Sequence, residues 1–293
     1  MVIGRLHRDN RNAHAFARLI GGILASAVMV TITVVVTGPA AAKAELPSGV
    51  PLVTLQLNLC NSGFASCYTQ YNNGRSVPEA RDVIVARRPD VVTLNEICRS
   101  DVVNSLYPAM VGNFPDSRAF WAFKAAGNRS TGQSYKCKNG DEYGIGILGR
   151  VRTADWAGVT ITDGLYPMQD TSSNEMRAWV CAGAIGNYFA CTTHLVSTSG
   201  TIALQQCKRL MEVEIPAFKT AVGVRAPVVV AGDLNLRYGG SPNVQSCVPP
   251  GYYRKGDGSV QHFMASTDLP FGYGQSVNLD YTDHDGWLVG VNP

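Results

Sequence analysis

Charged residues are scarce in this chain: they make up 16% of its 293 residues. Residues 1–44 hold five Lys or Arg side chains against one acid, and from residue 45 on the acids outnumber the bases by one. A body so close to neutral argues against binding of polyanions through bulk charge. Hydrophobic residues make up 45% of the chain, which excludes a disordered or low-complexity protein.

The sequence also lacks any Cys-x-x-Cys pair, although it contains eight cysteines, all after residue 45. An even number of cysteines in an exported chain favours disulfides over a zinc-thiolate site. Eight cysteines allow on the order of 100 pairings. Spacing favours two local pairs and leaves two others by elimination: Cys60–Cys67 and Cys181–Cys191, then Cys98–Cys137 and Cys207–Cys247.

The first segment predicts export. Its start is rich in arginine, an apolar run covers residues 19–36, and Ala42-Lys43-Ala44 fits a signal-peptidase site before Glu45. An uncleaved membrane anchor is the alternative, because the run approaches the length that spans a bilayer. In both cases we expect residues 1–44 to act as the leader. Residues 45–293 then form one domain outside the cytoplasm.

Strand-like and helix-like stretches alternate along the exported part, without an internal repeat or a Pro/Ser-rich linker. This alternation, with an antiparallel hairpin at 177–194, indicates a layered α+β domain. We expect the Gly-, Pro- and Tyr-rich stretch 239–275 to be a long surface loop. The predicted strands are 52–58, 91–95, 143–149, 177–185, 188–194, 228–233 and 286–291, and the predicted helices are 78–88, 100–110 and 201–222.

Oxygen-bearing side chains come at the ends of these predicted strands. Asn58 ends the first strand and Glu96 follows the second, while Asp233 and Asn235 lie two residues apart at the end of 228–233. A rigid sheet holds side chains at its strand ends, where the loops leave them accessible. Each residue taken alone is better explained as a turn or helix cap. Together, four oxygen donors without a Cys/His cluster favour Mg²⁺ or Mn²⁺ over zinc.

Histidines are few in the exported part, and two of the three lie at strand ends. His194 ends the strand 188–194, and His284 precedes the strand 286–291. A single histidine in such a place is usually structural. Two of three histidines at strand ends are more than a purely structural role would lead us to expect.

Taken in order, these residues resemble the endonuclease/exonuclease/phosphatase superfamily, which includes DNase-I-like nucleases, abasic-site endonucleases, neutral sphingomyelinases and inositol polyphosphate phosphatases. The resemblance covers residues 50–291. It rests on the motifs LNLCN (57–61), TLNEIC (93–98), YGIGILGR (143–150), MRAWVC (176–181), TTHL (192–195), AGDLN (231–235) and TDHDGW (282–287).

The resemblance implies a four-layer α/β/β/α sandwich of two packed mixed sheets, with the active site along one edge. It implies a divalent metal, Mg²⁺ or Mn²⁺, bound by Glu96 with Asn58 beside it and Asp283 on the same side. Asp233 would deprotonate the attacking water, and Asn235 would steady that carboxylate.

The remaining implied contacts are to the phosphate. His194 and His284 would contact the scissile phosphate, joined by Asn58, Arg177 and Tyr143. Because a phosphodiester repels hydroxide, a metal ion with imidazolium and guanidinium groups would neutralise its charge.

One position departs from the superfamily pattern. Where an aspartate usually supports the terminal histidine, this chain has Gln261. Its amide oxygen can accept a hydrogen bond but has no negative charge to favour an imidazolium. We therefore expect a weaker cation at His284, unless Asp280, Asp268 or His262 compensates.

These features predict a secreted, divalent-metal-dependent phosphodiesterase, most simply a nuclease. The alternatives are activity on sphingomyelin-like headgroups or phosphoinositides, or a non-catalytic binding protein of the same fold. Phe271 and Tyr273 are the candidates for a membrane-binding loop. We expect a monomer without an obligate protein partner, and five cations could form a nucleic-acid rim: Arg118, Lys124, Arg129, Lys136 and Lys138.

Overall fold

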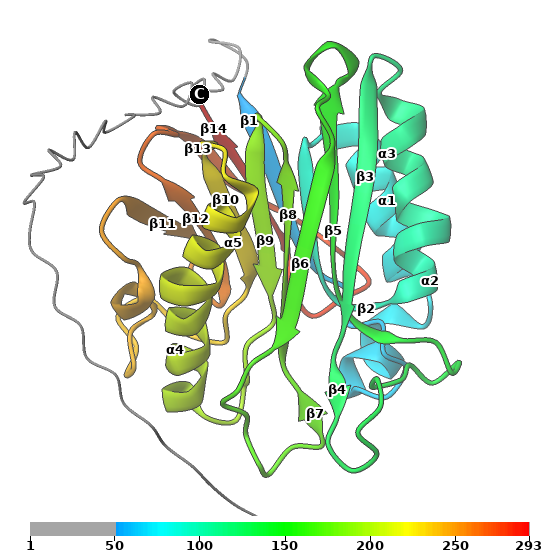
Figure 1. The fold of residues 1–293 in the computed structure, drawn as a ribbon. Helices are drawn as coiled ribbons and strands as arrows, with labels where there is room; N and C mark the ends of the chain where they lie inside the picture. Colours follow the sequence, from blue (N-terminus) through cyan, green and yellow to red (C-terminus); the bar gives the residue numbers. More distant parts are fainter. Residues whose placement is uncertain (1–50, 293) are drawn as a thin grey trace, which may run out of the picture. The chain divides into compact units, whose positions relative to one another are not determined.

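Two six-stranded sheets packed face to face form the centre of the computed structural model, which describes residues 51–292 (Figure 1). The first has the strand order β13–β14–β1–β2–β5–β3 and the second β11–β12–β10–β9–β8–β6. A short third sheet pairs β4 (Gly127–Asn128) with β7 (Glu175–Met176). The first sheet comprises β1 (Leu52–Asn58), β2 (Val91–Cys98), β3 (Ser117–Ala125), β5 (Tyr143–Arg152), β13 (Phe271–Val277) and β14 (Gly286–Val291). The second comprises β6 (Val159–Leu165), β8 (Ala178–Ala184), β9 (Tyr188–Thr193), β10 (Val228–Asp233), β11 (Tyr252–Gly256) and β12 (Gln261–Ser266).

Helices cover the outer face of each sheet (Figure 1). The first sheet packs against α1 (Ser76–Arg87), α2 (Arg99–Asp101), η2 (Val102–Leu106) and α3 (Tyr107–Asn113). The second packs against α4 (Gly200–Arg209), η4 (Leu210–Glu214) and α5 (Ile215–Val222). A separate apolar core fills the space between the sheets. The predicted four-layer sandwich is therefore confirmed. Three short helical turns complete the structure: η1 (Tyr68–Asn72), η3 (Thr153–Asp155) and η5 (Val244–Cys247).

Each sheet contains one parallel pair of strands at its centre: β1 with β2, and β9 with β10. Within each of the two large sheets, all other neighbouring strands pair antiparallel. Because parallel strands end at the same edge, the residues that follow them gather there.

The layer between the sheets changes from apolar to polar along these central strands. Alternate residues of a strand face the same side. In β10 this puts Val229 and Ala231 in the apolar core between the sheets and Asp233 at the end of the same face. In β1 the same alternation brings Gln56 and Asn58 to the polar end, where both are fully buried.

All four predicted disulfides are present: Cys60–Cys67, Cys98–Cys137, Cys181–Cys191 and Cys207–Cys247. Among the described residues no helix has the length and apolar character needed to cross a bilayer. The predicted leader, residues 1–44, lies outside the described residues.

The prediction of a surface loop over 239–275 is wrong, because this stretch contains β11, β12 and most of β13. β12 is buried throughout. It begins with the polar residues Gln261 and His262, so its sequence lacks the continuous apolar run that predicts a buried strand. β13 is an exposed edge strand with two glycines, and such a glycine-rich composition is also typical of loops.

Candidate active site

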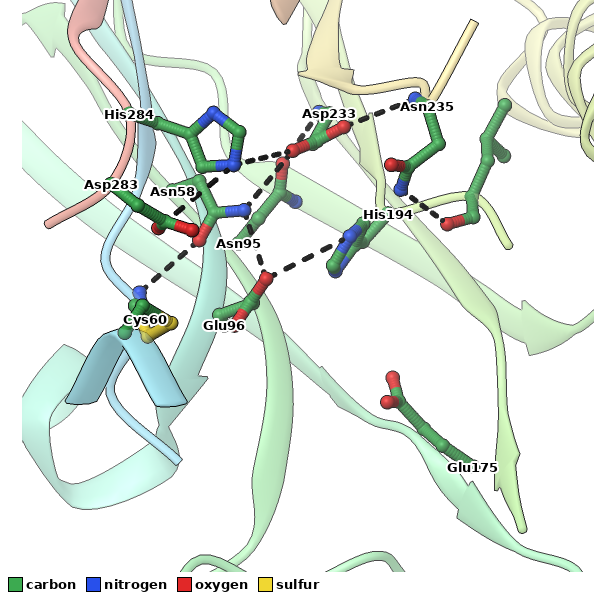
Figure 2. A network of polar contacts seen from close by, with 12 residues as sticks. Asn58, Cys60, Asn95, Glu96, Glu175, His194, Asp233, Asn235, Asp283 and His284 are labelled. Atoms are coloured by element: carbon green, nitrogen blue, oxygen red, sulfur yellow. Dashed lines mark hydrogen bonds and ion pairs between the residues drawn. A yellow bond between two sulfur atoms is a disulfide. The ribbon is translucent and has the colours of Figure 1, made fainter. Parts of the chain in front are cut away.

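The predicted site residues meet at the carboxyl ends of the parallel strands (Figure 2). Asn58 lies between two carboxylates, with its Nδ2 3.0 Å from Glu96 Oε1 and 3.1 Å from Asp233 Oδ2. His284 Nε2 is 3.6 Å from Asp233 Oδ2, and His194 Nε2 is 3.9 Å from Glu96 Oε1. Residues separated by up to 226 positions in the sequence thus line one space.

A β-bulge turns Glu96 into this space. Strict alternation would put Glu96 on the helix side of β2, since Leu94 lies in the core beneath the helices. The register of β2 against β5 shifts between Leu94 and Ile97, and Glu96 has a φ of 54°. A bulge that re-aims a side chain is common beside active sites.

Backbone strain is concentrated at the site. Of the five non-glycine residues with positive φ in residues 51–292, three are Cys60 (44°), Glu96 (54°) and Asn235 (48°). A positive φ is unfavourable for residues with a Cβ and persists only where surrounding contacts enforce it. Here Asn58 Oδ1 accepts the backbone N–H of Cys60, and Asn61 N–H donates to the Glu96 carbonyl.

Asp233 is almost fully buried, and three donors fix its carboxylate. Asn58 and Gln261 side-chain N–H groups donate to Oδ2, and the Asn235 backbone N–H donates to Oδ1. Asn235 is held in turn by its Nδ2, which donates to the Leu195 carbonyl at 2.9 Å. The predicted pairing of Asn235 with Asp233 therefore occurs through the Asn235 backbone.

Gln261 does not support His284, so the expectation of a hydrogen bond between them is wrong. The Gln261 side chain lies on the layer between the sheets, where Nε2 contacts Asp233 at 2.8 Å and Oε1 accepts from Gln56 at 2.9 Å. Sequence reasoning also missed Asn95, whose Oδ1 accepts both the Asp233 backbone N–H and Gln56 Nε2. Asn95 directly precedes Glu96, and β2 alternation turns it toward the other sheet.

The three residues named as compensators for Gln261 do not contact His284. His262 is buried, with Nε2–H donating to the Leu236 carbonyl and Nδ1 accepting from Arg254. Burial lowers the pKa of His262 to about 4, so this ring is neutral. The Asp280 side chain accepts from Asn278, and Asp268 lies beyond the far end of β12.

His194 is a neutral donor, which corrects the expectation of an imidazolium. Burial holds the pKa of His194 well below its usual range, and the nearby Arg177 charge lowers it further. Arg177 Nη1 lies 2.9 Å from His194 Nδ1, so Nδ1 is the acceptor and the proton is on Nε2. That Nε2–H points toward Glu96.

Arg177 is the fixed cation of the site. Burial disfavours its charge, but Glu175 at 2.7 Å, followed by Tyr143 and Glu96, raises the pKa of Arg177 above its usual value. Only Nη1 of the guanidinium makes hydrogen bonds among the described residues, which leaves its other nitrogens for a phosphate. Glu175 was not predicted, although it lies two residues before Arg177 in an extended segment.

Tyr143 lies beside this cation. It lines a small cavity of about 10 Å³ together with Glu175, Arg177 and His194. Burial raises the pKa of Tyr143 well above its usual value, so its hydroxyl remains a donor.

The donor set at Glu96 fits a hard divalent cation. Burial raises the pKa of Glu96 to about 7, and the charges of Asp233 and Glu175 add to the rise. Its carboxylate accepts one hydrogen bond from the described residues, from Asn58. A buried carboxylate beside other acids, with few donors, is stabilised by a cation. Mg²⁺ in particular keeps several waters and needs few protein ligands.

The other two predicted metal ligands, Asn58 and Asp283, are less suited to bind the ion than Glu96. Asn58 Oδ1 is engaged by the Cys60 N–H, so Asn58 presents nitrogen to both carboxylates. Asp283 is half exposed, with Oδ1 3.9 Å from His284 Nε2. In the described chain the one cluster of at least three His, Cys, Asp or Glu ligand atoms within 4.8 Å of one another is Glu96 with Cys60 and Cys67. Those two sulfurs are bonded to each other and are not thiolate ligands.

Two of the five cations expected to form a rim are engaged elsewhere, and three lie in loops at the site end. Arg118 lies near the opposite end of β3 and stacks on Trp156, and Lys124 is paired with Asp163 at 2.5 Å. Arg129, Lys136 and Lys138 do belong to the loops at the site end of β5.

The aromatic pair also lies away from the site. Phe271 and Tyr273 pair with Val291 and Gly290, at the far end of β14 from His284. A membrane-binding loop at these two residues would therefore not present lipid to the site.

Comparison with known proteins supports the fold. No family model matches the sequence. No curated protein matches it either. An endonuclease/exonuclease/phosphatase from Bacteroides vulgatus matches in structure with a TM-score of 0.54 at 12% identity, over 83% of this chain and 99% of that one. A mannosyl-6-phosphatase from Bacteroides thetaiotaomicron matches with a TM-score of 0.58 at 13% identity, over 82% and 99%.

A third solved structure is ANGEL2, a 2′,3′-cyclic phosphatase in complex with adenosine-2′,3′-vanadate. It matches with a TM-score of 0.57 at 14% identity, over 83% of this chain and 95% of that one. The chain has the endonuclease/exonuclease/phosphatase fold, as its motifs predicted. At these identities the matches define the fold and leave the substrate to the site itself.

Proposed function

We propose that this chain is an exported, divalent-metal-dependent hydrolase of phosphodiesters. The observation that carries the proposal is the meeting of Glu96, Asp233, Asn58 and His284 at one end of both sheets (Figure 2). Arg177 joins them through its contact with His194. Two of the structures with this fold are a mannosyl-6-phosphatase and a 2′,3′-cyclic phosphatase, which supports phosphoester chemistry. Four disulfides support an oxidising compartment outside the cytoplasm.

Glu96 is the proposed metal ligand, with Asp283 on the side of the site where His284 lies. When bound, the divalent ion would neutralise charge on the phosphate and stabilise the leaving oxygen. Asn58 joins Glu96 to Asp233 through its N–H₂ group, so the metal side and the water side keep a fixed spacing. This rigidity is what in-line attack requires.

Asp233 is the proposed general base. Its carboxylate is fixed by donors and its Oδ2 lies 3.6 Å from His284 Nε2, so it can take a proton from a water bound beside that ring. Neutral His194 donates through Nε2–H. The free guanidinium nitrogens of Arg177 and the Tyr143 hydroxyl are further donors for the phosphate oxygens.

Among phosphodiesters, a nucleic-acid strand is the substrate we propose. The loops at the site end carry the cations Arg129, Lys136 and Lys138. The aromatic candidates for lipid contact, Phe271 and Tyr273, lie at the opposite end of the first sheet. The near-neutral body predicts modest affinity with a shallow dependence on salt.

The test is turnover by the purified protein with Mg²⁺ on three substrates: plasmid or single-stranded DNA, sphingomyelin dispersions, and bis(p-nitrophenyl) phosphate. We expect hydrolysis of the chromogenic diester and of DNA, lost on chelation and in Asp233→Ala and His284→Ala. A contaminating nuclease would survive both substitutions. Turnover of sphingomyelin alone would replace the nucleic-acid proposal with the lipid one. Absence of turnover on all three would refute the hydrolase proposal.

A further inference from the structure

A row of buried side-chain hydrogen bonds crosses from the first sheet to Asp233 in the second. Thr93 Oγ1 donates to Gln56 Oε1, and Gln56 Nε2 donates to Gln261 Oε1 at 2.9 Å. Gln261 Nε2 then donates to Asp233 Oδ2 at 2.8 Å. None of these four residues is more than 1% exposed.

Chemistry fixes the direction of this row. An ionised carboxylate only accepts, so Gln261 must present nitrogen to Asp233 and oxygen to Gln56. Gln56 must then present nitrogen to Gln261, and its oxygen faces the Thr93 hydroxyl, which can donate. The second hydrogen on Gln56 Nε2 goes to Asn95 Oδ1 at 2.7 Å. Turning over the Gln261 amide would oppose like atoms at both of its ends, and turning over the Gln56 amide would set its oxygen against Gln261 Oε1 and Asn95 Oδ1.

We propose that Gln261 is a positioning residue for Asp233 and not a partner of His284. Its N–H holds Oδ2 on the side that faces His284 Nε2, and the cross-strand pairing of Asp233 with Gln261 brings the two side chains together. An aspartate at 261 would be shorter and acceptor-only, so it would set a second carboxylate against Asp233. The inference rests on the proposed role of Asp233 as the base.

The kinetic test compares Gln261→Glu and Gln261→Met with Gln56→Met on bis(p-nitrophenyl) phosphate. Gln261→Glu keeps the shape and replaces only the donating N–H₂. We expect kcat to fall about 10- to 100-fold in both Gln261 variants with KM nearly unchanged, the loss typical of a hydrogen bond to a charged group. Gln56→Met is the matched control, because it disrupts the same row but leaves the contact between Gln261 and Asp233. Its kcat should fall less.

An activity-independent test uses the side-chain amide signals of Gln261 in ¹H–¹⁵N NMR spectra, assigned by their loss in Gln261→Met. We expect them to shift in Asp233→Asn and to stay in place in His284→Ala. The reverse pattern would overturn the proposal. So would wild-type kcat in Gln261→Glu where Asp233→Asn is inactive. If the wild-type protein turns over no phosphodiester, the proposed function fails, and the spectra still decide which residue Gln261 holds.

Discussion

The two sheets repeat one arrangement of strands but contribute different chemistry. In each sheet a parallel pair lies at the centre with two antiparallel strands on either side. In the first sheet β1 ends in Asn58 and β2 carries Glu96 two residues before its end, and in the second β10 ends in Asp233 and His194 follows β9. Across the interface Asn58 contacts Asp233 at 3.1 Å, and Glu96 lies 3.9 Å from His194.

The two carboxylates at this interface differ in how well they are hydrogen-bonded. Asp233 accepts three hydrogen bonds from the described residues, whereas the side chain of Glu96 accepts one. Burial raises the pKa of Glu96 to about 7, which is the mark of a charge without enough partners. This difference supports the proposed roles, in which the well-bonded acid is fixed for proton transfer and the other acid binds a cation.

Removing the acid of the second sheet should have the largest effect. We expect Asp233→Asn to lower kcat about 1,000-fold, because the asparagine cannot take a proton from water. The measurement is steady-state hydrolysis of bis(p-nitrophenyl) phosphate. Asp268→Asn, at the opposite end of the second sheet, is the matched control and should keep wild-type kcat. Equal rates for the two variants would remove Asp233 from the mechanism.

Removing the acid of the first sheet should abolish the response to metal. Mg²⁺ at about 100 times its Kd should stabilise the wild-type protein by about 2.7 kcal/mol. Glu96→Gln should lose this stabilisation, together with most of the activity. Thermal unfolding with and without Mg²⁺ measures it, with Glu142→Gln, an acid outside the site, as the control. Full stabilisation of Glu96→Gln by Mg²⁺ would place the ion elsewhere.

The two buried histidines of the second sheet, His194 and His262, allow a further comparison. Each accepts a hydrogen bond from an arginine on Nδ1. The Nε2–H of His194 is directed into the site, while that of His262 is used by the Leu236 carbonyl. We expect His194→Gln to lower kcat about 10- to 100-fold, in line with the loss of a donor to the phosphate. His262→Gln should leave kcat within about twofold of wild type, as expected for a residue outside the chemistry.

His262 should instead contribute to the acid sensitivity of the fold. Burial lowers the pKa of His262 to about 4, whereas in the unfolded chain it takes the usual value of about 6.5. Its contribution is therefore complete above about pH 6.5 and lost as the pH falls toward 4, for a total of about 3 kcal/mol. Urea unfolding at pH 7 and pH 4 should show a smaller difference for His262→Gln. An unchanged difference would assign the acid sensitivity to other groups.

The smallest effect is expected at the edge of the first sheet far from the site. Phe271→Ser and Tyr273→Ser should leave both kcat and vesicle binding unchanged, because both residues lie at the far end of β13. A cosedimentation assay with sphingomyelin vesicles measures this. If these variants lose vesicle binding, and the wild-type protein hydrolyses sphingomyelin, the lipid alternative is favoured.

Much of the fold could be predicted from the sequence because the central strands are buried runs with sharp ends. All seven predicted strands exist, and polar residues at their ends marked the site. The strands β3, β6, β11 and β13 were missed because they are edge strands. The buried strand β12 was missed because it begins with polar residues. Composition does not distinguish an edge strand with glycines from a loop.

The site was harder to predict where it depends on contacts between sheets. The motifs identified Glu96 and Asp233, but the bulge that re-aims Glu96 depends on the register of β2 against β5. The contact of Gln261 with Asp233 depends likewise on the register of β12 against β10. The neutral state of His194 results from burial beside Arg177, which a linear sequence does not reveal.

The most direct test of the cation site is a crystal of the protein soaked in Mn²⁺ and measured at an anomalous wavelength. We expect a peak within coordination distance of the Glu96 carboxylate, with Asp233 turned toward His284 beside it. A map with no peak at Glu96, or with its only peak at another face of the molecule, would contradict it.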